Sequence, residues 1–203
     1  MNYDIFENVD FGNIESIISK YGNLAPYGLN GEKLVDITPG FSRTENTLTT
    51  RYGLGQFPYH TDTAYWHIPA HYIVLYCKHP GSGGRRTNFI DTGMLRNDSK
   101  FESLANNAIY LVKRNFKSFY SRPLFNTRCG VCFRFDSDCM IPQNKAGYAL
   151  VEKMLSVEDS SFVVGHNWKK GDLLVLNNHR FVHSRGSSNT DDFDRILTRG
   201  LIL

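Results

Sequence analysis

Short β-prone runs occur in both halves of the 203-residue chain, on either side of a stretch with helical periodicity. They are rich in branched aliphatic and aromatic residues, as strands commonly are. Between them, apolar residues recur at helical spacing over residues 98–110 and 144–155. Strands that bracket a helical middle predict a mainly β fold with flanking helices and a β-barrel-like or jelly-roll core. The expected strands are residues 34–37, 72–77, 87–91, 162–164, 172–176 and 195–203.

A chain of this length is expected to form a single domain over residues 1–203, with a helical insert at roughly residues 98–160. A short amphipathic helix is expected over residues 11–21, capped by Asp10 or Asn13, and the Thr-rich residues 44–53 are expected to form a loop or edge segment. Neither a long apolar run nor a signal-like N-terminus is visible, so the default expectation is a cytoplasmic protein without a membrane partner.

His60-Thr61-Asp62 places an imidazole and a carboxylate two residues apart in a strand-like run. Residues i and i+2 of a strand point to the same face, so the two side chains are expected to project together. His183 is a third candidate ligand. Two imidazoles and one carboxylate leave one face of a metal open, as a non-haem Fe(II) oxygenase requires, whereas structural zinc takes four closed ligands. Each motif alone is a weak signal, because the chain has seven histidines.

Two arginines follow His183 at positions 195 and 199. Four residues apart on one strand, Arg195 and Arg199 are expected to emerge on the same face. Two guanidinium groups that point into a barrel are costly unless they meet anions, and a carboxylate matches the guanidinium fork with two parallel hydrogen bonds. The spacing therefore indicates an acidic ligand, and a pair of exposed arginines on an edge strand is the equally simple alternative.

Four motifs occur in a fixed order along the chain: His60-Thr61-Asp62, the glycine pair that leads to Thr87, residues 171–183 ending at His183, and Arg195 with Arg199. Together they resemble the Fe(II)/2-oxoglutarate-dependent dioxygenases of the taurine dioxygenase (TauD/TfdA) type, over about residues 56–203. This resemblance implies a cupin-like double-stranded β-helix. It also implies Fe(2+) as cofactor, and 2-oxoglutarate and O2 as co-substrates.

The resemblance also implies roles for individual residues. The iron ligands match His60, Asp62 and His183, and the distal carboxylate of 2-oxoglutarate is expected to meet Arg195 and Thr87. Because Arg195 lies 12 residues beyond His183, which of the two arginines anchors the co-substrate stays open. The expected substrate-side residues are Arg199, Gln56 and Trp66, with core packing as the alternative for the tryptophan.

The activity that the resemblance implies is hydroxylation of an unactivated C–H bond in a small polar or amino-acid-like substrate, with succinate and CO2 as co-products. A peptide or protein hydroxylase on the same fold and a catalytically silent jelly-roll binding protein are the alternatives. A single-strand nucleic-acid binder would use the basic and aromatic residues 113–122, but the net charge of +3 gives that idea little support. Cys129 and Cys132 form an isolated CxxC, which favours reduced, partly buried thiols over a zinc site or a redox pair.

Overall fold

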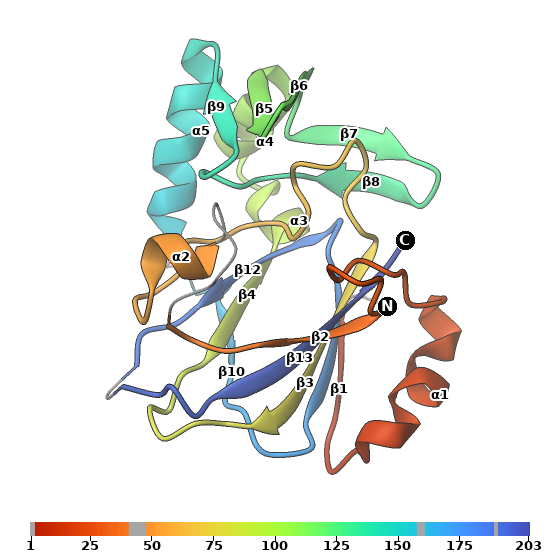
Figure 1. Ribbon diagram of the computed structural model, residues 1–203. Coiled ribbons are helices and arrows are strands. Elements are labelled where there is room, and N and C mark those ends of the chain that lie inside the picture. The colour runs from red at the N-terminus through yellow and green to blue at the C-terminus, as the bar shows by residue number, and fades with distance from the viewer. Residues whose placement is uncertain (1–2, 41–47, 158–160, 189–190) are drawn as a thin grey trace.

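The computed structural model describes residues 3–40, 48–157, 161–188 and 191–203 (Figure 1). Among the described residues, no helix is both long and apolar enough to span a membrane. The helices are η1 (Phe11–Asn13), α1 (Ile14–Ile18), η2 (Ser19–Tyr21), α2 (Leu48–Tyr52), α3 (Thr92–Leu95), α4 (Ser99–Asn107) and α5 (Lys145–Leu155). The strands are β1 (Tyr3–Phe6), β2 (Leu34–Ile37), β3 (Tyr72–His79), β4 (Thr87–Asp91), β5 (Tyr110–Arg114), β6 (Lys117–Ser121), β7 (Leu124–Thr127), β8 (Gly130–Phe133), β9 (Met140–Pro142), β10 (Val164–His166), β11 (Leu173–Asn177), β12 (Phe181–Arg185) and β13 (Ile196–Ile202).

Two antiparallel sheets form the lower body of the molecule in Figure 1. The larger sheet has the order β1-β11-β3-β13-β2, and the smaller one has the order β10-β4-β12. Neighbours in these sheets come from distant parts of the chain, because β3 pairs with both β11 and β13. The last strand thus lies in the interior of the larger sheet, and Arg199 cannot be an edge-strand arginine.

The alternation of side chains along the strands decides what faces the space between the two sheets. On β3 and β11 the interior residues include Ile73, Leu75 and Leu174, and on the facing sheet Phe89 and Phe181 complete the same cluster. Because alternate residues of a strand share a face, His183 lies on the interior face two residues after Phe181. By the same argument, positions 87 on β4, 185 on β12 and 199 on β13 also face the interior.

The N-terminal helices cover the outer face of the larger sheet. Ile14 and Ile18 of α1 are buried against Val74 of β3 and Val175 of β11. The expected helix over residues 11–21 is therefore present, as η1, α1 and η2 in succession. Asp10 and Asn13 occupy the N-cap positions of η1 and α1 as expected, but neither makes a side-chain hydrogen bond to the helix.

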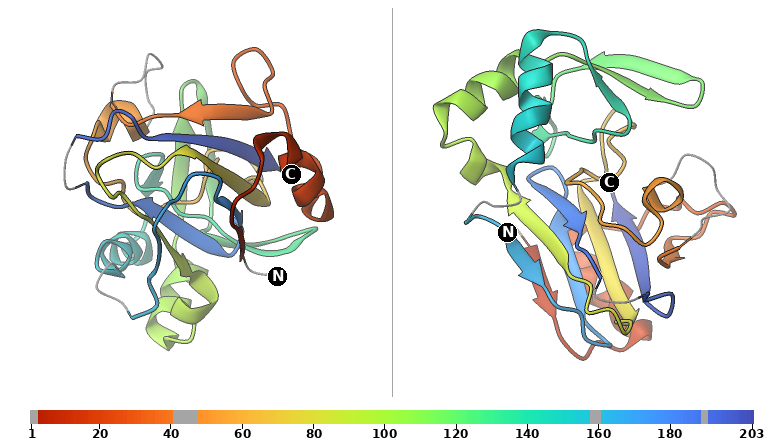
Figure 2. Two further views of the ribbon diagram at one scale, coloured as in Figure 1. Left: turned by 90° about the horizontal axis from the view of Figure 1, so that it is seen from below. Right: turned by 90° about the vertical axis from the view of Figure 1, so that its left-hand side faces the viewer.

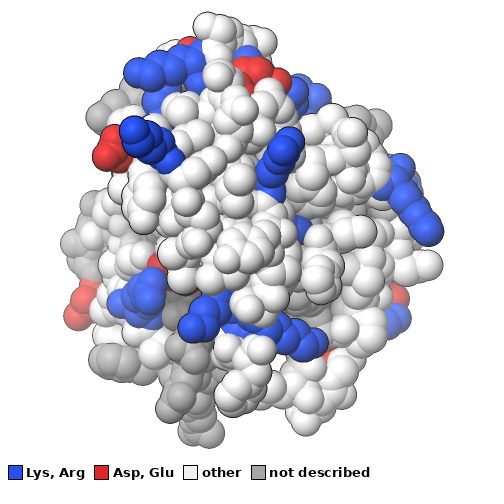
Figure 3. Space-filling view, turned by 90° about the horizontal axis from the view of Figure 1, so that it is seen from above, with Lys and Arg blue, Asp and Glu red and all other residues white. Residues whose placement is uncertain are grey.

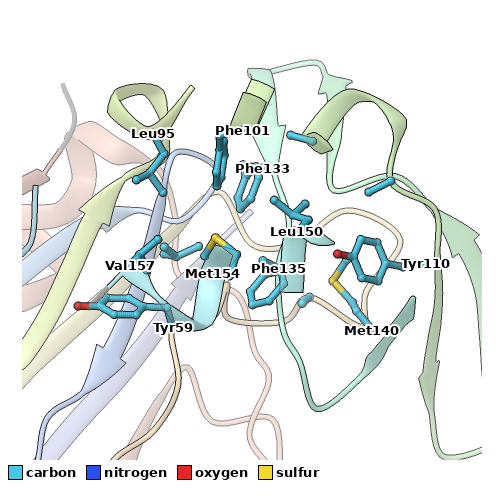
Figure 4. Packing of buried hydrophobic residues seen from close by; sticks show 14 of the residues in the cluster. Tyr59, Leu95, Phe101, Tyr110, Phe133, Phe135, Met140, Leu150, Met154 and Val157 are labelled. Carbon is cyan, nitrogen blue, oxygen red and sulfur yellow. The ribbon is translucent and has the colours of Figure 1, made fainter. Parts of the chain in front are cut away.

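The segment between α4 and α5 stands above the two sheets, as both Figure 1 and Figure 2 show. Helices α4 and α5 pack on the outer face of the smaller sheet: Phe101 and Leu150, labelled in Figure 4, belong to the same buried cluster as Ile90 and Val182. Full burial of such a side chain stabilises a fold by about 1.5–3 kcal/mol. This cluster therefore anchors the insert to the strand that carries His183.

Two expectations about local structure are wrong in part. The insert is not purely helical, because strands β5 to β9 lie between α4 and α5. Residues 48–52 form the helix α2 rather than a loop or edge strand, and residues 44–47 lie outside the described residues. In both places the sequence mixes aromatic, basic and polar residues without a clear period, so pattern alone could not predict the element.

Candidate metal centre

His60 is held beside His183 by the backbone. The His60 amide donates to the carbonyl of His183 at 2.9 Å, and the His183 amide donates to the carbonyl of His60 at 3.0 Å. Three residues earlier, Phe57 donates to the carbonyl of Arg185 at 2.9 Å. The segment before Asp62 thus runs along β12, and this pairing brings together two histidines that lie 123 positions apart in the chain.

Asp62 begins a turn rather than continuing a strand. Thr63 has a positive φ of 57°, and the buried Asn178 fixes the turn: its side chain accepts from the Asp62 amide at 2.9 Å and donates to the Asp62 carbonyl at 3.0 Å. The strand geometry expected for His60-Thr61-Asp62 is therefore wrong, although the two side chains do converge. The turn, held by the buried side chain of Asn178, brings His60 and Asp62 together, which strand alternation was expected to do.

His60, Asp62 and His183 form a buried group whose potential ligand atoms all lie within 4.8 Å of one another. Nε2 of His60 lies 3.8 Å from Oδ1 of Asp62, and the two imidazole centroids are 4.3 Å apart. In the part of the chain that the structure describes, this is the one group of three or more His, Cys, Asp or Glu residues with such spacing. The three residues predicted from their separate motifs thus meet at one place.

The protonation states of this group suit a cation. The His60 Nδ1 lies 2.9 Å from the carbonyl of Pro58, so Nδ1 is a donor and Nε2, 3.8 Å from Oδ1 of Asp62, is the nitrogen left to bind a metal. Burial and the neighbouring His60 lower the pKa of His183 to about 3, so its imidazole is neutral at physiological pH. Burial opposes ionisation of Asp62, but Arg199 and the two histidines outweigh it and hold its pKa below the usual range.

Arg199 lies directly against the carboxylate of this group. Its Nη1 is 3.1 Å from Oδ1 and 3.3 Å from Oδ2 of Asp62. Tyr27, which no sequence motif indicates, also contacts Arg199. Its hydroxyl donates to the Arg199 carbonyl at 2.6 Å, and the hydroxyl oxygen lies 3.4 Å from Nε of Arg199. Burial lowers the pKa of Arg199, but Asp62 and Tyr27 raise it by more. A fixed positive charge therefore sits beside the potential ligands.

Arg195 occupies a different part of the interior. A register shift between Ile196 and Leu197 breaks the strand alternation, so the four-residue spacing no longer places both arginines on one face by itself. Arg195 is 4% exposed, and its buried Nε has no hydrogen-bond partner among the described residues. Burial and the nearby Arg85 lower its pKa. The backbone of Gly81 (φ +80°) lies close to Arg195. A side chain at this position would collide with it, because a Cβ on residue 81 would lie 2.7 Å from Cβ of Arg195.

Around Arg195 lies a buried ion pair that sequence spacing did not reveal. Both Arg85 and Asp192 have fully buried side chains, and they are joined by two hydrogen bonds of 2.9 and 2.8 Å. Arg85 also donates to the carbonyls of Leu54 and Gly186 at 2.8 and 3.0 Å. The pair joins three loops at this end of the barrel, and its one carboxylate interacts with the charges of both Arg85 and Arg195.

Thr87 is buried at the start of β4 and accepts a hydrogen bond of 2.9 Å from the indole of Trp168. Besides Arg199, the other two expected substrate-side residues are less informative. Gln56 is exposed, four residues before His60. Trp66 packs against the core between the sheets, which favours its structural interpretation.

The remaining five histidines lie outside this group. His71 and His179 have ring centroids 4.8 Å apart, and the Nε2 of His179 lies 2.9 Å from the Pro69 carbonyl. His67 stacks on Phe119, and the others are His79 and His166, which lie near Asp194 and Asp172. Asp194 is far from His79 in sequence, and Asp172 follows His166 only after a turn. The spacing of these residues therefore did not indicate either contact.

We expect His71→Gln to make the fold less sensitive to acid. Burial and His179 lower the pKa of His71 to about 4, whereas an unfolded histidine titrates near 6.5. The unfolded state therefore binds a proton first as pH falls, and stability is lost progressively from about pH 6.5 down to about 4. The urea midpoint of the variant should fall less between pH 7 and pH 5 than that of the wild type. Equal losses in both proteins would contradict this expectation.

All four cysteines are free thiols, and Cys77, Cys132 and Cys139 are buried while Cys129 is exposed. Burial raises the pKa of Cys77 to about 11 and that of Cys132 to about 12. These buried thiols therefore remain protonated and unreactive at neutral pH, as inert packing residues do.

The basic and aromatic residues 113–122 lie on the β5–β6 hairpin. Arg114 lies over the ring of Tyr65 at 4.0 Å, and Phe119 is stacked on His67, so part of this set packs inward. Seen from above, some Lys and Arg side chains lie singly, with Asp or Glu beside several of them, and others form a short row in the lower part of the view (Figure 3).

No family model matches the sequence, and no curated protein matches it significantly. Solved structures do share its fold. An asparagine oxygenase in complex with Fe(II), 2S,3S-3-hydroxyasparagine and succinate has a TM-score of 0.71 at 18% identity, over 90% of this chain and 60% of that one. The non-heme iron oxygenase OrfP with Fe, succinate and (3S)-hydroxy-L-Arg has a TM-score of 0.71 at 17% identity, over 94% and 63%.

A third similar structure is AAD-2 in complex with Mn(II) and N-oxalylglycine, with a TM-score of 0.71 at 15% identity, over 99% of this chain and 84% of that one. This chain thus spans about three fifths of the length of the first two proteins. The predicted fold class is confirmed: the protein is mainly β, with the cupin-like double-stranded β-helix of these structures. At such identities the similarity shows the fold alone.

Proposed function

We propose that this protein is an Fe(II)- and 2-oxoglutarate-dependent oxygenase of the taurine dioxygenase type, which hydroxylates a C–H bond of a small amino-acid-like substrate. The observation that carries the proposal is the buried group of His60, Asp62 and His183, with the buried Arg195, whose Nε has no hydrogen-bond partner among the described residues, elsewhere in the same interior. A binding module on this fold has no need for both features.

The donor set fits a ferrous ion. Two neutral imidazoles and one ionised carboxylate form the facial set that non-haem Fe(II) oxygenases use. Nδ1 of His183 is buried without a hydrogen-bond partner among the described residues, and Nε2 of His60 faces Asp62 while its Nδ1 is held by the Pro58 carbonyl. Once bound, the iron supplies the oxidative chemistry, and the protein supplies binding, orientation and exclusion of water.

Arg195 is the residue that we assign to the distal carboxylate of 2-oxoglutarate. Its buried guanidinium lacks a carboxylate partner of its own, because Asp192 is bound in bidentate fashion by Arg85. A dicarboxylate would neutralise this charge and satisfy its donors, and Thr87 would provide a further hydroxyl donor. Arg199 is less suited to this role, because it already lies against Asp62.

Arg199 is instead the residue that we assign to an anionic group of the substrate. Its side chain keeps 31% of its surface accessible and lies beside the potential iron ligands. Binding of iron to Asp62 would reduce the attraction between that carboxylate and Arg199, which leaves guanidinium donors for a substrate carboxylate. The asparagine oxygenase and OrfP hold hydroxylated amino acids, and this supports an α-amino acid as substrate.

The test is anaerobic titration of the metal-free protein with Fe(II) and then with 2-oxoglutarate, followed by the weak visible charge-transfer band of the chelate. We expect the band in the wild type and not in His183→Ala. Succinate release with a panel of amino acids would then identify the substrate. Iron binding without a band would contradict the proposed co-substrate, and failure to bind iron would favour the silent jelly-roll interpretation.

We expect Arg195→Ala to weaken 2-oxoglutarate binding by about 100-fold, since it removes a buried bidentate contact to a carboxylate. The Fe(II) affinity should stay within about threefold, because Arg195 does not contact the ligand group. Calorimetric titration of the metal-loaded protein without oxygen measures both constants. Arg86→Ala, which removes an exposed neighbouring arginine, is the matched control. If instead Arg199→Ala abolishes co-substrate binding and Arg195→Ala does not, the two assignments are reversed.

A further inference from the structure

The indole of Trp168 fixes the hydroxyl of Thr87. Its Nε1 lies 2.9 Å from Oγ1 of Thr87, and the two residues are 7% and 4% exposed. Trp168 is also part of the core cluster between the sheets, with Leu174 and Leu197. Packing on this cluster holds the indole in the orientation in which its N–H reaches Thr87.

This hydrogen bond determines what Thr87 can do for a ligand. An indole N–H is a donor and never an acceptor, so the hydroxyl oxygen of Thr87 must accept from it. The hydroxyl proton is then available to donate, and within the described parts of the chain no group accepts it. Thr87 therefore presents a donor to the interior.

Thr87 lies in the same part of the barrel as Arg195. It follows Arg85 by two residues, and Arg85 interacts electrostatically with Arg195. Cys77, which also interacts with Arg195, packs in the same core cluster as Trp168. Arg195 is likewise purely a donor, so both Thr87 and Arg195 offer hydrogens to a ligand, while the nearby carboxylate of Asp192 is bound by Arg85.

We propose that Trp168 is a specificity-determining residue, which locks Thr87 as a donor so that this end of the pocket accepts a carboxylate and rejects a carboxamide. The inference rests on the proposed function, in which the distal carboxylate of 2-oxoglutarate lies at Arg195 and Thr87. A carboxylate presents acceptors alone, whereas an amide presents an NH2 group that neither donor can satisfy. A buried polar group without a partner is costly, and sites built on hydrogen bonds discriminate strongly for this reason.

The experiment compares the binding of 2-oxoglutarate with that of its distal amide, 2-oxoglutaramate. Dissociation constants are measured by calorimetry on the Mn(II)-loaded protein, so that no turnover is needed. In Trp168→Phe the ring remains but the N–H is lost, and Thr87 can rotate to accept from the amide. We expect the preference for the acid over the amide to fall by about tenfold, the effect of one hydrogen bond.

A double-mutant cycle with Thr87→Val separates this role from packing. We expect Thr87→Val to lower the preference as well, and Trp168→Phe to have no further effect on it in the Thr87→Val background. Thr87→Ser, which keeps the hydroxyl, should keep the preference. A merely structural role of Trp168 would lower the melting temperature and weaken both ligands equally.

An unchanged preference in Trp168→Phe, or additive effects in the double variant, would overturn the inference while 2-oxoglutarate binding by the wild type still supports the proposed function. If the metal-loaded wild type binds neither ligand, the proposed function itself fails. The two failures are thus distinguished by the wild-type titration alone.

Discussion

His60→Ala is expected to abolish turnover and to weaken Fe(II) binding by more than about 100-fold. Removing a residue that only hydrogen-bonds to a metal ligand typically lowers metal affinity by about 10–100-fold, and removing the ligand itself should cost more. The imidazole lies 3.8 Å from Asp62 and is oriented by the Pro58 carbonyl, so no other described side chain can replace its Nε2. Asp62→Ala should give the same loss. Anaerobic metal titration and succinate release measure the two effects.

His71→Ala is the matched control for this prediction. It also removes a partly buried imidazole, but His71 lies outside the ligand group and contacts Tyr72 and His179 instead. Its Fe(II) affinity and turnover should match those of the wild type. Urea unfolding of each variant checks that the fold is retained. Full Fe(II) affinity in His60→Ala would refute the assigned centre.

The sequence was sufficient to predict β3, β11 and β13, because their apolar, β-prone runs depend on local residues alone. It did not predict β12, the strand that carries His183, because all five of its residues are buried although their sequence alternates no polar and apolar faces. Alternation also predicts that position 183 shares the interior face with Phe181, and position 199 with Leu197 and Leu201. The convergence of His60 and Asp62 was correctly expected, but for a different geometric reason.

Contacts between distant residues could not be predicted in this way. Asn178 fixes Asp62 across 116 positions, and Arg85 meets Asp192 across 107. Trp168 gives no local signal at all, because its partner Thr87 lies 81 positions earlier in the chain, at the start of β4. Such contacts arise from the topology, which brings the segments before β4 and β13 together. The strands of the insert were missed because residues 110–142 show no clear period.

Asp192→Ala is expected to lower the free energy of unfolding by about 3–5 kcal/mol, the usual result of removing one partner from a buried ion pair. Both side chains of the Arg85–Asp192 pair are fully buried, and without the carboxylate the Arg85 guanidinium is left as an uncompensated charge. The interior would then hold the cations of Arg85, Arg185 and Arg195 with no anion among these partners. Urea unfolding at pH 7 measures the loss.

Asp191→Ala is the matched control, because it removes the exposed neighbouring carboxylate and should change stability by less than about 0.5 kcal/mol. The double variant Arg85→Met/Asp192→Leu replaces both charges with apolar groups and should be more stable than Asp192→Ala, since the desolvation cost of the Arg85 charge disappears when that charge is removed.

If 2-oxoglutarate binds at Arg195, a saturating concentration should restore part of the stability of Asp192→Ala by supplying an anion to the same interior. A loss of less than about 1 kcal/mol in Asp192→Ala would show that the pair is solvated in solution and does not hold the three loops together.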